Sequence, residues 1–242
     1  MDKLGFCFLT INNPYNLELW KQWFDPLRSD FCIHAKQPTI ILPELKHRLC
    51  PKYIPTRWGG FGLVEASYEM FKYMFQYSPI SKVCLISDTC LPVKNFNIAY
   101  NTLMSDNSSF FYYKPIPEWK EHRCRFIKDA FQTVWNQSQW MTITREAFEI
   151  IDQHFEYYKN ICRRTFCIDE HFFINILLEK GYTNIINKKY HYFKFLKDEP
   201  HPVELNEQDF IDICNNPQYL FMRKFAQTLD KKFWPNIIYS GE

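Results

Sequence analysis

The alternation of continuous apolar runs with helix-like patterns is the feature that most constrains the fold of this chain. Residues 3–11 form an apolar run that ends in a turn signal at 12–14, which is typical of a buried strand. A second run of this kind covers residues 82–87. Between the two runs, residues 17–27 and 63–77 place large apolar side chains at helical spacing. Strands separated by helices predict βαβ units and a mainly parallel central sheet flanked by helices, so the expected fold class is α/β.

Shorter segments extend the expected sheet and its helices. Further strands are expected over four short apolar runs, at residues 31–33, 39–42, 109–113 and 139–143. Further helices are expected over residues 144–158, 169–180 and 206–213, the last with Asn206 as its N-cap. Residues 114–138 are rich in Pro, Arg, Lys and Gln and are expected to form a loop near the site. Because no repeat or low-complexity linker divides the chain, we expect a single domain over residues 1–242.

Composition narrows the class of protein. Hydrophobic residues make up 46% of the chain and aromatic residues 19%, which excludes a disordered chain because these side chains would stay in water. The formal net charge is +2 and no basic stripe stands out, so we expect no nucleic-acid partner. No apolar run reaches the length of a membrane span, so we expect no transmembrane segment.

The cysteines are typical of reduced thiols. Their count is nine, an odd number, and no CxxC spacing occurs among them. Cys162 and Cys167 are close enough in sequence for a disulfide or a metal knuckle, but no second ligand pair with zinc spacing follows them. We therefore expect no disulfide and a cytoplasmic location.

The ends of the expected strands indicate where a ligand binds. Ligands of parallel sheets bind beyond the carboxyl ends of the strands, which predicts that residues 12–15, 34–37 and 88–92 line one cleft. The chain has no Gly-rich phosphate loop and no GxSxG elbow, so dinucleotide, NTPase and serine-hydrolase functions lose their main support. The nearest approach to a metal-binding Asp-x-Asp is Asp88-Thr89-Cys90, and cysteine is a poor ligand for magnesium or manganese. We therefore expect no metal and no cofactor.

A set of short strings, in a fixed order along the chain, carries a resemblance to a known family. The strings are 3–11 (KLGFCFLTI), 31–34 (FCIH), 54–60 (IPTRWGG), 85–92 (LISDTCLP), 138–145 (SQWMTITR), 169–173 (DEHFF) and 219–225 (YLFMRKF). Each string is weak alone, but the ordered set is fairly specific. Over residues 3–225 the chain resembles the core-2/I-branching β-1,6-N-acetylglucosaminyltransferase family, whose xylosyltransferase-like and plant branches are included.

The resemblance implies a GT-A-like fold and an inverting sugar transfer that needs no metal. The donor would be a UDP-sugar, carrying N-acetylglucosamine or a xylose-like sugar, and the acceptor a hydroxyl of a glycan or glycoconjugate. The glutamate of the family's Asp-Glu pair, which acts as general base, falls on Glu170. The family's basic residue for the donor diphosphate falls on Lys224, and its strand-end segment beside the sugar nucleotide falls on Ser87 and Asp88.

Other residues are placed around this expected site. His34, at the end of the second strand, is assigned to the donor side, and no spacing supports its use as a metal ligand. The family's acceptor-packing aromatic falls on Phe195, and Trp140 and Asp169 are added to the acceptor side. On sequence alone, Asp169 at a helix start is more typical of a capping residue than of a site residue. Trp140 and Trp58 are more typical of core residues than of sugar platforms.

The sequence also departs from the family pattern. Lys36 stands where the animal branch has an aspartate that helps to hold the nucleoside, and residues 202–204 lack the second diphosphate-binding arginine. Arg223 is the candidate to replace that arginine, although neighbouring residues on a strand point to opposite faces. These departures keep open an alternative, a catalytically inert sugar- or nucleotide-binding domain with the same fold. A scaffold that uses its aromatic surface, and binds no nucleotide, is the third interpretation.

Overall fold

A computed structural model describes residues 2–76, 79–116, 127–128, 130–196 and 201–239. Its centre is a six-stranded sheet in the order β2-β1-β3-β8-β5-β9. The strands β1 (Lys3–Thr10), β2 (Ser29–Ala35) and β3 (Ile80–Ser87) run parallel, with β1 in the middle. The strand β8 (Thr142–Thr144) runs antiparallel to β3 and β5 (Ser109–Phe111), and β9 (Ile185–Asn187) is parallel to β5. The expected α/β class with a mainly parallel sheet is confirmed.

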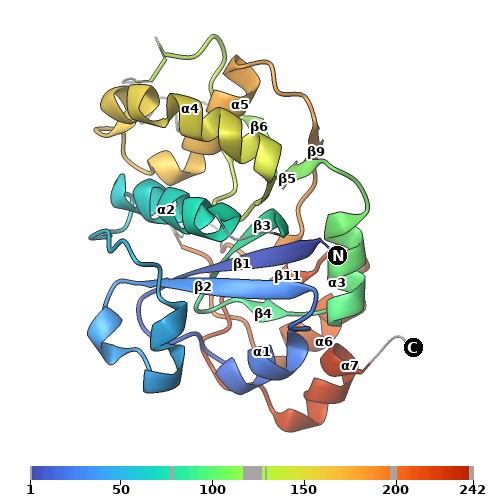
Figure 1. The fold of residues 1–242 in the computed structure, drawn as a ribbon. Coiled ribbons are helices and arrows are strands. Elements are labelled where there is room, and N and C mark those ends of the chain that lie inside the picture. The colour runs from blue at the N-terminus through green and yellow to red at the C-terminus, as the bar shows by residue number, and fades with distance from the viewer. Residues whose placement is uncertain (1, 77–78, 117–126, 129, 197–200, 240–242) are drawn as a thin grey trace.

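Helices cover both faces of this sheet (Figure 1). One face packs against α2 (Gly62–Gln76), α4 (Arg145–Cys162) and α5 (Phe172–Glu179). The other packs against α1 (Leu17–Trp23), α3 (Phe96–Met104), α6 (Glu207–Cys214) and α7 (Trp234–Ile238). In the central strand, Cys7 faces the first layer and Phe6 and Phe8 face the second, as the two-residue period of a strand requires. A strand buried on both faces reads as a continuous apolar run, which explains the pattern at residues 3–11.

Two small sheets complete the fold. The first joins β4 (Leu91–Pro92), β10 (His191–Tyr192) and β11 (Phe221–Met222) in the order β10-β11-β4. The second pairs β6 (Tyr113–Pro115) with β7 (Trp135–Gln137). The sequence analysis did not predict either small sheet, because strands of two or three residues leave no periodic signal.

Several expected elements are confirmed with altered bounds. The helix expected over residues 206–213 is α6, and Asn206 caps it in a reciprocal capping box with Asp209. The helix expected over residues 17–27 ends earlier, at Trp23, because Pro26 follows closely. The helix α3 was not predicted.

Two expected elements are wrong. Residues 39–42 do not form a strand: a 3-10 helix covers Pro38–Ile40 and a second begins at Pro43, and prolines on both sides leave no room for a strand ladder. The helix expected over residues 169–180 is divided. A 3-10 helix covers Ile168–Glu170, and α5 begins only at Phe172, because the backbone angles of His171 between them (φ −140°, ψ −25°) are not helical.

The eight cysteines among the described residues are free thiols, seven of them buried, and Cys124 lies outside the described residues. Across the described ranges, every helix is too short or too polar to cross a membrane.

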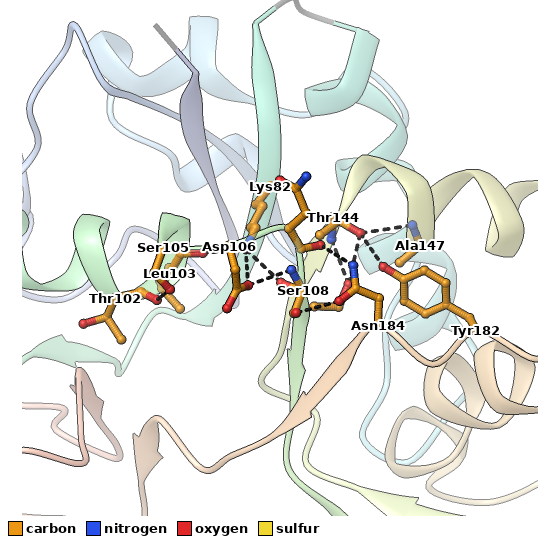
Figure 2. Close-up of polar contacts among 12 residues, drawn as sticks. Lys82, Thr102, Leu103, Ser105, Asp106, Ser108, Thr144, Ala147, Tyr182 and Asn184 are labelled. Atoms are coloured by element: carbon orange, nitrogen blue, oxygen red, sulfur yellow. Dashed lines mark hydrogen bonds and ion pairs between the residues drawn. The ribbon is translucent and has the colours of Figure 1, made fainter.

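A buried lysine joins β3 to the turn between α3 and β5 (Figure 2). The Lys82 ammonium donates to the carbonyl oxygens of Leu103 at 2.7 Å and Ser108 at 2.8 Å. Its only nearby carboxylate among the described residues is that of Asp106, at 3.8 Å. Burial lowers the pKa of Lys82 from 10.5 to about 8, because desolvation disfavours the ammonium more than Asp106 favours it.

We expect the contribution of Lys82 to stability to rise with pH between about 8 and 10.5. In this window the unfolded chain still binds the proton that the native lysine has released, so raising the pH favours the native state by at most about 1.4 kcal/mol per pH unit. The measurement is denaturant unfolding across the window for the wild type and for Lys82→Met, which cannot titrate. The stability difference between them should grow in favour of the wild type as pH rises, and a constant difference would show that Lys82 titrates normally.

Candidate active site

The carboxyl ends of β1, β2 and β3 meet at one edge of the sheet, and backbone bonds join the segments that follow them. The Tyr15 N–H donates to the Asp88 carbonyl at 2.9 Å, and the Gln37 N–H donates to the Ile11 carbonyl at 3.0 Å. Segments 12–15, 34–37 and 88–92 therefore lie side by side, where the strand-end rule predicted a cleft.

Asp88 is tied to this edge by its side chain. Its Oδ2 accepts a hydrogen bond from the Ile11 N–H at 2.9 Å. Burial raises the pKa of Asp88 above its ordinary value, while the Ile11 N–H and the Arg223 guanidinium reduce the rise. Ser87 is buried, and its hydroxyl lies 3.2 Å from the Thr89 hydroxyl. Asp88 thus faces the site, whereas Ser87 supports the turn that carries it.

Arg223 and Lys224 follow β11 directly and lie against this turn. The Phe225 N–H donates to the Thr89 carbonyl at 2.9 Å, and the Leu205 N–H donates to the Lys224 carbonyl at 2.7 Å. Because β11 ends at Met222, the alternation of a strand does not govern these two residues. The objection that they must point to opposite faces therefore does not apply.

The Arg223 guanidinium is held on an aromatic ring. Its central carbon lies 4.3 Å from the centroid of the Trp140 ring, a cation–π contact. Burial lowers the pKa of Arg223 from its ordinary value, while Cys90, Asp88 and Glu204 oppose this. Within the described part of the chain, the buried Arg223 Nε has no hydrogen-bond partner. A buried donor of this kind is costly unless something accepts its proton, so it is a candidate for contact with a ligand.

Trp140 is 7% exposed, so it is a core residue that supports Arg223 rather than an open platform. Gln137, which lies just before Trp140 in the chain, contacts the turn that contains Asp169 and Glu170. The Gln137 amide donates to the Asp169 carbonyl at 3.4 Å, and its oxygen accepts from the Ile174 N–H at 2.7 Å. The segment 135–140 thus connects the Asp169–Glu170 turn with Arg223.

Glu170 is half-buried and is oriented by an amide. The Asn136 Nδ2 lies 3.2 Å from the Glu170 carbonyl oxygen and 3.4 Å from its Oε2. Asp169 lies within the same 3-10 turn, while the N-cap position of α5 is His171. The expected capping role of Asp169 at α5 is therefore wrong.

His34 is buried at the end of β2. Its Nε2 accepts a hydrogen bond from the Ile54 N–H at 3.0 Å, and its ring stacks on Tyr53 with 7° between the planes. Burial lowers the pKa of His34. An imidazole whose Nε2 accepts carries its proton on Nδ1, and that nitrogen is buried with no partner among the described residues. His34 is thus a neutral side chain at the end of β2, and its Nδ1 donor has no partner among the described residues.

Phe195 and Trp58 are both exposed aromatic side chains. Phe195 is 51% exposed and makes an edge contact with Phe193, at 5.7 Å between ring centroids. Trp58 was interpreted as a core residue, but it is 58% exposed, so that interpretation is wrong.

Sequence reasoning missed Asn136 and Gln137, which hold the acidic turn. They lie in a stretch that its composition marked as loop, and polar residues buried by distant partners give no periodic signal. It also missed Cys90, whose thiol lies 3.3 Å from the Ser87 backbone nitrogen.

Among the described residues, no group of three or more His, Cys, Asp or Glu side chains is placed to hold a metal. A cavity of about 270 Å³ lies at the amino-terminal end of β3, lined by Lys82, Asp106 and Arg145 among others. It contains none of the expected site residues and lies at the opposite end of β3 from Asp88.

Comparison with known proteins identifies the family. The family model described as "Core-2/I-Branching enzyme" matches residues 4–216. "Glycosyltransferase BC10" of Oryza sativa subsp. japonica is 27% identical over 179 residues, which cover 67% of this chain and 44% of the rice protein. The chain thus spans less than half the length of this relative. Because the family match extends over most of its residues, the chain belongs to the core-2/I-branching enzyme family.

Proposed function

We propose that this chain is an inverting glycosyltransferase, which moves a sugar from a UDP-sugar to a hydroxyl of a glycan or glycoconjugate. The supporting observation is the segment 135–140, which contacts the Glu170 turn through Asn136 and the Arg223 guanidinium through Trp140. One carboxylate and one cation are the two groups that such a reaction needs. N-acetylglucosamine and a xylose-like sugar are the proposed donor sugars.

Glu170 is the proposed general base. An attacking hydroxyl must lose its proton as the bond to the anomeric carbon forms, and a positioned carboxylate can accept it. The Asn136 amide contacts Oε2 of Glu170, so this bond orients the carboxyl group. Of the two acids in the turn, Glu170 is the one that we assign to the proton.

Arg223 and Lys224 are proposed to stabilise the leaving diphosphate. Positive charge placed where negative charge develops lowers the barrier of the reaction. Arginine donates to phosphate oxygens in a fixed fork, and a buried guanidinium with one unused donor is suited to this contact. Asp88 would stay beside Arg223 and set its orientation.

Arg223 and Lys224 also support the proposal that the transfer needs no metal. The Asp88 carboxylate accepts a hydrogen bond from the Ile11 N–H, and the positive charge of Arg223 acts to lower its pKa. A divalent cation beside Asp88 would compete with the guanidinium for the same carboxylate. We therefore propose that Arg223 and Lys224 supply the charge that a metal provides in other sugar-nucleotide enzymes.

An inert nucleotide-binding domain is the competing function. Lys36, where the animal branch has an acid, is exposed at the end of β2, and its carbonyl accepts a hydrogen bond from the Tyr53 hydroxyl at 3.2 Å. Such a domain would bind UDP but would not turn over its sugar. Donor hydrolysis or transfer separates the two functions.

Glu170→Gln should abolish transfer while the fold and donor binding stay intact. Glutamine keeps the size of the side chain and its bond to Asn136 but cannot accept the proton, so kcat should fall about 10²–10⁴-fold. Asp169→Asn, the same change one residue earlier, should be milder, and Glu149→Gln on the exposed face of α4 is the neutral control. Near-normal kcat in folded Glu170→Gln would show that another group is the base.

Lys224→Ala should weaken UDP binding. It removes one charge-assisted contact, worth about 1.5–3 kcal/mol, so calorimetry should give a Kd for UDP raised by roughly 10- to 150-fold. Lys46→Ala, at an exposed position, is the control for a general loss of charge. An unchanged Kd would mean that Lys224 is only solvated.

Activity should survive chelation. If Arg223 and Lys224 supply the positive charge, turnover of UDP-sugar in excess EDTA should equal turnover in untreated buffer. The measurement is the rate of UDP release with EDTA, with manganese, and with neither. Loss of turnover in EDTA, restored by manganese, would contradict metal independence and reassign Asp88 to a metal.

A further inference from the structure

Two large aromatic side chains from distant segments meet on the surface. Trp58 precedes α2 and is 58% exposed, and Phe166 precedes the Glu170 turn and is 45% exposed. Their ring centroids lie 5.1 Å apart with 75° between the planes, an edge-to-face contact. His201 makes a similar contact with Trp58, at 5.0 Å and 73°. We call the Trp58–Phe166 pair the aromatic platform.

The backbone under the aromatic platform is built for close contact. The Cys167 N–H donates to the Gly59 carbonyl at 2.8 Å, which joins the two segments. Gly59 has φ +66, and a Cβ there would lie 2.5 Å from the Phe166 ring, so only glycine fits. Cys167 also has a positive φ, of 54°. The platform is thus held in place by its backbone, and it would lose little conformational freedom on binding a ligand.

The aromatic platform lies next to the proposed base. The Glu170 N–H donates to the Cys167 carbonyl at 3.1 Å, which closes a tight turn. A turn of this kind spans less than about 7 Å between its first and last Cα atoms, and one further residue adds about 3.8 Å. The Cα atoms of Phe166 and Glu170 are therefore at most about 11 Å apart, the length scale of a disaccharide.

We propose that the aromatic platform binds a sugar ring of the acceptor glycan, adjacent to the ring whose hydroxyl reaches Glu170. This inference rests on the proposed transferase function. Exposed clustered aromatics are unfavourable in water unless a ligand covers them. A pyranose covers such rings well, because its C–H face packs on an aromatic surface while its hydroxyl groups stay hydrogen-bonded around the edge. The occupant is thus a neutral pyranose ring, and its contact is stacking rather than charge pairing.

The test measures sugar binding by saturation-transfer NMR with three probes: N-acetyllactosamine, N,N′-diacetylchitobiose and xylobiose. At least one probe should bind the wild type, and Trp58→Ala and Phe166→Ala should each weaken it by about fivefold to tenfold, the size of one aromatic contact. Trp58→Phe and Phe166→Tyr should restore most of the binding, since both keep an aromatic face. Tyr157→Ala is the matched control, because Tyr157 is 63% exposed on α4.

Binding of UDP, measured in parallel, separates this inference from the proposed function. All variants should bind UDP like the wild type. If UDP binds but no probe does, or if Trp58→Ala and Phe166→Ala bind the probes normally, the aromatic platform is not an acceptor site and the transferase proposal stands. A loss of self-association in both variants, with sugar binding unchanged, would assign the pair to a protein contact and overturn the inference. Failure of the wild type to bind or hydrolyse UDP-sugar would instead refute the proposed function.

Discussion

The parallel pairing of β1 between β2 and β3 is the constraint on which the rest of the structure depends. The strand β1 pairs with each neighbour along seven positions. Its residues Leu4 to Thr10 pair with β2, and its residues Lys3 to Leu9 pair with β3. Parallel strands end at the same edge, so this pairing alone brings the segments after them together. Burial on both faces fixes the register, because a slip by one residue would move Phe6 and Phe8 into the wrong layer.

A second, smaller sheet brings residues near the carboxyl terminus to the candidate site. The sheet β10-β11-β4 places Arg223 and Lys224 against the turn that follows β3. The Trp140 ring packs against the Arg223 guanidinium, and Asn136, shortly before Trp140, donates a hydrogen bond to the Glu170 turn. The Glu170 turn and the Arg223–Lys224 segment, about fifty residues apart in the chain, are thus connected through segment 135–140.

Much of the fold was predictable, and the reasons differ between elements. Buried strands, such as those at residues 3–11 and 82–87, are recognised in the sequence as continuous apolar runs. The helix α4 is recognised by its helical periodicity and α6 by its capping residue. The break at His171 was not predictable, because no helix breaker stands there. The His171 ring and the Asn175 amide both bond to the Trp135 carbonyl, a tertiary contact that sequence spacing does not reveal. The extent of the domain, residues 1–242, stays a prediction.

The candidate site was also predictable only in part. Asp88 was predicted from its position at the end of a strand. Glu170 and Lys224 were predicted only from the resemblance to a family, because their spacing in the sequence does not indicate a site. The support from Asn136 and Gln137, and the exposure of Trp58, depend on contacts across the fold. Phe195 is still an acceptor residue by prediction only.

The central claim is a single displacement at the anomeric carbon, with Glu170 on one side and Arg223 and Lys224 on the other. The most direct measurement is the anomeric configuration of the first product formed from UDP-α-N-acetylglucosamine, followed by proton NMR before the anomers equilibrate. The account predicts a β-configured first product, because a base on one face and a leaving diphosphate on the other require inversion. An α-configured first product would contradict it.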